Sequence, residues 1–205
     1  IRTGLSKMMG TTHTRIARRI AEELRITDSR SINLLVIGSN APDEWADFPH
    51  HYGKEKEIIE NILMARQLFL EGDDECFHRL GVALHYIADR WTLKPRIKDK
   101  HTEWEKSIDA APILNEAELK KAIEEAPIPS KEVKAYHSFL EKLELIDQGL
   151  SKEENFADKI IEYALQARPS AWSTPTFDLN FAYRIGLKVG KHIMKMPSKA
   201  EDNPY

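Results

Sequence analysis

The chain has 205 residues, of which 41% are hydrophobic and 31% charged, and its formal net charge is −3. Length and composition suit one globular domain with a substantial core, and the slight negative charge argues against a dedicated nucleic-acid binder. The single cysteine, Cys76, excludes an intrachain disulfide and a cysteine-based zinc site. No stretch approaches the roughly 20 apolar residues of a membrane span, so we expect a soluble protein, cytoplasmic rather than secreted. Its native start and oligomeric state stay open.

Helical periodicity dominates the first part of the chain. Apolar residues recur at three- and four-residue steps over 13–24, which predicts an amphipathic helix. The apolar run over 32–37 ends at Gly38, and we interpret it as a short buried helix or extended segment, because no second strand is available to pair with it. Residues 41–53 are rich in Pro, Asp, His and aromatics, which predicts a loop.

The remaining pattern is also helical. A long helix is predicted over 58–68, broken at Gly72, and another over 80–91, ending before Pro95. Strand-like alternation is nearly absent, so the predicted fold is all-α, a compact bundle of about 7–9 helices. The later helical patterns cover 101–109, 115–125, 131–147, 152–167 and 177–195.

We expect one helical domain over residues 1–196. Within it, 8–105 would form the half that carries the metal site, and 106–196 would complete the bundle. Residues 197–205 are polar, which predicts a loose tail.

Histidine is concentrated in the first half, where His85-x-x-x-Asp89 is the strongest local element. Residues four apart lie on one face of a helix, so this imidazole and carboxylate can bind one ion, or the carboxylate can bridge two. Apolar flanks indicate partial burial, and a buried carboxylate needs a partner. Zinc accepts imidazole nitrogen and carboxylate oxygen where thiolates are lacking.

Further candidate ligands flank this element, although each alone also fits a core histidine or a surface ion pair. A loop that concentrates carboxylate and imidazole groups is more often a site than scaffolding. The candidates are His13 at the start of the first helix, the loop residues Asp43, His50 and His51, and the helical pair His101 and Glu105.

In this order the motifs resemble the zinc-dependent phospholipase C and fungal single-strand nuclease superfamily, over roughly residues 8–105. The resemblance implies an all-helical fold with a multinuclear zinc site. It implies that His13 and Asp89 hold one zinc ion, and that His101 and Glu105 belong to a third, incomplete site because Pro95 stands where another ligand is expected. It implies that the ligands of the remaining zinc ion are Asp43, His50 or His51, His85 and Asp89.

The resemblance therefore implies a zinc-dependent phosphodiester hydrolase with two zinc ions, in which a metal-activated water attacks a phospholipid or nucleotide phosphodiester. Asp43 and Asp89 would be its catalytic residues. Asp43 would bind zinc and accept the proton of the water, and Asp89 would bridge the ions. Lys94 and Arg96 lie in a short basic loop and are candidate contacts to the substrate phosphate. The alternative is a degenerate, metal-stabilised helical module for binding or assembly.

The substrate stays open between lipid and nucleotide. An exposed apolar rim beside the site would favour a phospholipid. A cleft with stacking aromatics would favour nucleic acid, and the candidates are Trp45, Trp91 and Trp104.

Overall fold

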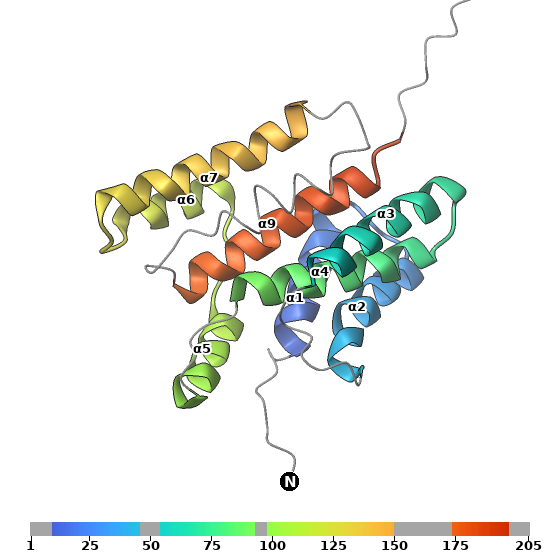
Figure 1. Ribbon diagram of the computed structural model, residues 1–205, viewed down its shortest axis with the longest axis horizontal. Coiled ribbons are helices and arrows are strands. Elements are labelled where there is room, and N and C mark those ends of the chain that lie inside the picture. The colour runs from blue at the N-terminus through green and yellow to red at the C-terminus, as the bar shows by residue number, and fades with distance from the viewer. Residues whose placement is uncertain (1–9, 46–53, 93–97, 150–173, 197–205) are drawn as a thin grey trace, which may run out of the picture.

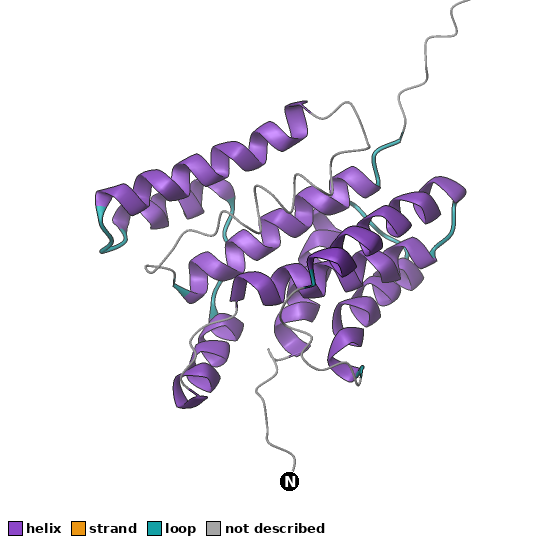
Figure 2. Cartoon of the chain, in the orientation of Figure 1, coloured by secondary structure: helices purple, strands orange, loops and turns teal. Residues whose placement is uncertain are grey.

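The structure, a computed structural model, describes residues 10–45, 54–92, 98–149 and 174–196, and these ranges contain helices and no strand (Figures 1 and 2). The all-α prediction is confirmed for this part of the chain. None of the described helices combines the length and hydropathy that crossing a bilayer requires. The predicted helix over 152–167 lies outside the described residues. The described helices are α1 (Gly10–Glu23), α2 (Ser29–Glu44), α3 (Glu55–Glu71), α4 (Glu75–Thr92), α5 (Lys98–Ala110), α6 (Glu116–Glu125), α7 (Ser130–Gly149) and α9 (Pro175–Ile193).

Helix α4 is the centre of the fold. It packs most extensively against α2, α3 and α9, and α1 also contacts it (Figure 1). Every residue from Leu80 to Asp89 is buried. A helix that is buried all round lies in the core rather than at the surface. The polar groups on this stretch, His85 and Asp89, are therefore held inside the molecule.

Helices α2 and α4 touch backbone to backbone. A Cβ atom added to Gly38 would collide with the carbonyl of His78, and one added to Gly81 would collide with the carbonyl of Leu35. Only glycine on both helices permits this approach. The contact brings the C-terminal half of α2 alongside the middle of α4.

The prediction that α2 stops near Gly38 and that a loop begins at residue 41 was wrong. The helix continues to Glu44 and includes Pro42. Contacts with other helices outweigh these local helix breakers: Gly38 and Ser39 are buried, and Nδ2 of Asn40 donates to Oγ1 of Thr14 on α1 at 3.1 Å. Tertiary packing thus extends the helix to Asp43.

An aromatic cluster joins α4 to α7 and α9. The Trp91 ring lies 5.1 Å from Phe139 and 5.4 Å from Phe181, centroid to centroid. Tyr136 stacks on Phe181 at 5.3 Å. These buried rings tie the α6–α7 part of the chain to the body that carries α4.

Candidate metal centre

The middle of α4 carries a buried imidazole–carboxylate pair. His85 is 0% and Asp89 2% exposed. Nε2 of His85 lies 3.3 Å from Oδ2 of Asp89, as the four-residue spacing predicted. The other carboxylate oxygen, Oδ1, faces a different helix.

Helix α1 brings His13 to the same carboxylate. Nε2 of His13 lies 3.4 Å from Oδ1 of Asp89, and the rings of His13 and His85 stack at 4.1 Å between centroids with a 21° tilt. The neighbours of His13 fix the helix on both sides. Thr12 Oγ1 donates to Oδ1 of Asp109 on α5 at 3.0 Å, and Asn40 on α2 donates to Oγ1 of Thr14 at 3.1 Å.

Asp43 completes the group from the last turn of α2. Ligand atoms of His13, Asp43 and His85 all lie within 4.8 Å of one another. Both histidines are buried, whereas Asp43 is half-buried. Three helices therefore converge on one place, and Asp43 is the most exposed of these residues.

The pKa values of the two histidines are shifted in opposite directions. Burial alone lowers the pKa of His85, but the charges of Asp89 and Asp43 and the hydrogen bonds around the ring outweigh it, so the pKa is raised. Burial lowers the pKa of His13, and the charge of His85 lowers it further. Without a metal, the pair therefore holds its proton on His85 in preference to His13.

A backbone carbonyl orients His85. Nδ1 lies 3.0 Å from the carbonyl oxygen of Ser39 in the buried interior. Because a carbonyl only accepts hydrogen bonds, Nδ1 must carry the proton in this contact. Nε2 is then the ring atom directed at Asp89, the usual arrangement of a histidine that ligates a metal.

The donor set fits a zinc ion. Two imidazole nitrogens and one carboxylate oxygen of Asp43 lie within 4.8 Å of one another, Asp89 contacts both imidazoles beside this group, and no thiolate is among these side chains. Both Nε2 atoms lie 3.3–3.4 Å from the Asp89 oxygens, which is long for a hydrogen bond. Nitrogen and oxygen ligands of this kind suit zinc.

Of the other predicted ligands, only Glu105 has a side chain within the described part of the structure. Glu105 lies on α5 and is only 6% exposed, and like Asp89 it is not one of the three residues whose ligand atoms lie within 4.8 Å of one another. His101 lies on α5, and its side chain is outside the described part of the structure, as are the residues His50, His51, Lys94, Pro95 and Arg96.

The tryptophans differ in their access to solvent. Trp91 is 1% exposed and belongs to the aromatic cluster. Trp104 is half-buried and donates from Nε1 to the Thr92 carbonyl at 3.2 Å. Trp45, two residues after Asp43, is 43% exposed. Of these three, only Trp45 is placed to stack with a ligand from solution.

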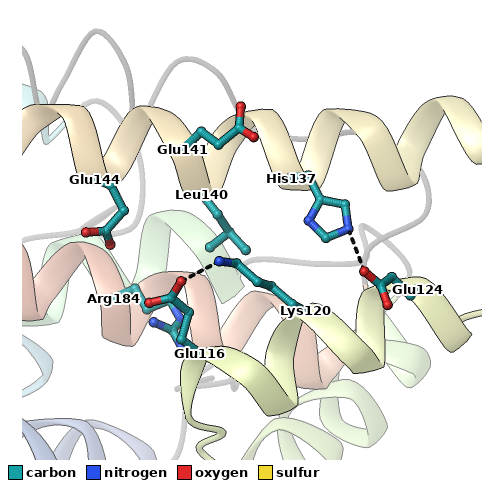
Figure 3. Close-up of a pocket in the computed structure, with 8 residues that line it drawn as sticks. All are labelled: Glu116, Lys120, Glu124, His137, Leu140, Glu141, Glu144 and Arg184. Carbon is teal, nitrogen blue, oxygen red and sulfur yellow. Dashed lines mark hydrogen bonds and ion pairs between the residues drawn. The ribbon is translucent and has the colours of Figure 1, made fainter.

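A cleft of about 760 Å³ lies elsewhere, between α6, α7 and α9 (Figure 3). Two ion pairs lie among its side chains. Lys120 contacts Glu116 at 2.5 Å, and His137 contacts Glu124 at 3.7 Å. None of its lining residues belongs to the histidine–aspartate group. They are Glu116, Lys120, Glu124, His137, Leu140, Glu141, Glu144 and Arg184.

Comparisons of this chain with protein-family models, with curated proteins and with solved structures find no match.

Proposed function

We propose that this chain is a zinc-dependent hydrolase of phosphodiesters. The observation that carries the proposal is the convergence of His13, His85 and Asp43 from three helices, with Asp89 in contact with both histidines. Buried charges of this kind are costly unless they are paired or coordinate a metal. The order of the motifs along the chain resembles zinc phospholipases and nucleases, which supports a phosphodiester as the substrate.

Each residue of the group would have a role that follows from its position. Zinc bound here would supply a Lewis acid and lower the pKa of a water molecule to about 7. The two oxygens of Asp89 face different histidines, which suits a carboxylate shared between two cations. Asp43 is half-buried at the wetter side, so it can accept a proton from a water that reaches the site.

The same burial also favours a second function. His85 and Asp89 are almost fully enclosed, so a metal held by them would link α1, α2 and α4 whether or not a substrate reached it. The chain would then be a metal-stabilised helical module for binding or assembly. Structural zinc sites stabilise folds in this way without turnover.

Turnover of bis(4-nitrophenyl) phosphate tests the proposal. We expect hydrolysis that a chelator abolishes and zinc restores. Asp89→Asn and Asp43→Asn should each lower zinc content, because both carboxylates would hold the ion. At saturating zinc, Asp43→Asn should still lower turnover by about a hundredfold or more, as expected when a proton-accepting group is lost. His137→Gln, which changes a histidine on α7, is the matched control and should change neither.

The outcomes separate the two functions. Zinc bound at one or more equivalents without hydrolysis of the diester, of phosphatidylcholine vesicles or of single-stranded DNA would support the module. A protein that binds no zinc at all would contradict both functions.

A further inference from the structure

We infer that the glycine contact between α2 and α4 is the positioning device of the metal centre, and that it acts through the backbone carbonyl of Ser39 on the ring of His85. This inference rests on the proposed zinc site and extends it to residues that bind no metal. Gly38 and Gly81 are its positioning residues.

The contact lies one helical turn from the ligands on both helices. On α4, the glycine at 81 precedes His85 by four residues and Asp89 by eight, so all three share one face. On α2, Ser39 precedes Asp43 by four residues and directly follows Gly38. The crossing of the two backbones therefore sets how far the α2 ligand lies from the α4 ligands.

The approach of the two backbones leaves no space for a side chain. A Cβ on Gly81 would meet the Ser39 nitrogen at 2.7 Å as well as the Leu35 carbonyl. Both obstacles are backbone atoms of α2, which cannot rotate away as a side chain can. Any substitution at Gly81 must therefore push α2 off α4.

Displacing α2 would act on two parts of the site at once. The Ser39 carbonyl would withdraw from Nδ1 of His85, now 3.0 Å away. Asp43 would move with the same helix, away from ligand atoms that now lie within 4.8 Å. His13 would be affected less directly, because α1 is also held to α5 through Thr12 and Asp109.

Gly81→Ala tests the inference, with Gly190→Ala as a matched control. A Cβ on Gly190 would meet the Cδ1 atom of Leu24 at 2.6 Å, which is the end of a flexible side chain. We expect Gly81→Ala to weaken zinc binding by about 10–100-fold, the effect of losing a group that orients a ligand. Gly190→Ala should bind zinc like the unchanged protein, even if both variants lose thermal stability.

A second readout needs no zinc. In zinc-free protein labelled with ¹⁵N-histidine, we expect the Nδ1 proton of His85 to be observed and protected from exchange with solvent. Gly81→Ala should lose this protection and Gly190→Ala should keep it.

The unchanged protein also provides a test if Gly81→Ala does not fold. With ¹³C-carbonyl serine added to the label, the coupling across the hydrogen bond from His85 Nδ1 to Ser39 should be detectable. Its absence, or equal zinc affinity in the two folded glycine variants, would overturn the inference. If the protein binds no zinc but shows the coupling and the loss of protection, the positioning would stand and the proposed function would fail.

Discussion

At the scale of residues, one carboxylate organises the site. Each oxygen of Asp89 faces a different histidine, and the charge of Asp89 is the largest influence that raises the pKa of His85. The stacked ring of His13 is left with a lowered pKa. A zinc ion would take the place of the proton that this arrangement holds on Nε2 of His85.

Removing the charge of Asp89 should reverse the shift at His85. In Asp89→Asn, burial still lowers the pKa of His85, whereas the charge that most strongly raises this pKa is removed. We therefore expect the pKa of His85 to fall. Histidine resonances followed by NMR in zinc-free protein measure this. Glu75→Gln, which changes an acid on α4 ten residues before His85, is the control and should leave the titration of His85 unchanged. An unaltered titration of His85 in Asp89→Asn would contradict the conclusion that Asp89 raises its pKa.

The same shifts give the zinc-free protein a pH dependence. The raised pKa of His85 contributes stability that is complete below about pH 6.5, the ordinary histidine value, and is lost as the pH rises through the raised pKa. The lowered pKa of His13 acts in the opposite sense and removes stability as the pH falls below about 6.5.

We therefore expect a shallow maximum in the unfolding free energy of zinc-free protein, centred near the ordinary histidine pKa. Urea titrations between pH 5 and 9 would show it. In His85→Gln the loss of stability on the alkaline side should disappear. A stability that rises steadily across the range in the unchanged protein would contradict the raised pKa of His85.

At the scale of elements, sequence periodicity predicted the helices well and their ends less well. Gly72 was predicted to end a helix, and it is the left-handed residue that follows α3. The continuation of α2 to Glu44 was missed, because the glycine at 38 indicates a break locally and a close helix contact in the folded chain. Such a contact depends on α4, which is distant in sequence.

The sequence likewise predicted some parts of the candidate site and missed others. The four residues His13, Asp43, His85 and Asp89 were predicted because their side chains carry recognisable ligand chemistry. The Ser39 carbonyl was not predicted, because a backbone acceptor has no signature in the sequence.

Gly72→Ala should cost about 1–2 kcal/mol in the free energy of unfolding, because alanine is strained at a φ of 75° while the surrounding space is empty. Gly72→Asn should cost less, since asparagine adopts this conformation more readily. Urea denaturation measures both. An equal loss in the two variants would indicate that the lost stability does not come from the backbone conformation.

At the scale of the molecule, the aromatic cluster links the half that carries the histidine–aspartate group to the rest. Phe181 contacts Trp91, Tyr136 and Phe139 and is fully buried. One domain over residues 1–196 stays a prediction, and the rings that connect α4 with α7 and α9 provide a way to test it.

Phe181→Ala should cost about 3–5 kcal/mol, the usual penalty for a cavity left by a buried ring. We expect one cooperative transition in circular dichroism and in tryptophan fluorescence, shifted equally by the substitution. Two separate transitions, with only one of them shifted, would contradict a single domain.

The most direct test of the account is anomalous scattering at the zinc absorption edge from crystals grown with zinc. We expect a peak between His13, Asp43, His85 and Asp89, which should vanish in crystals of Asp89→Asn. Zinc found only at other positions, or no zinc peak at all, would contradict the central claim that these helices build a metal centre.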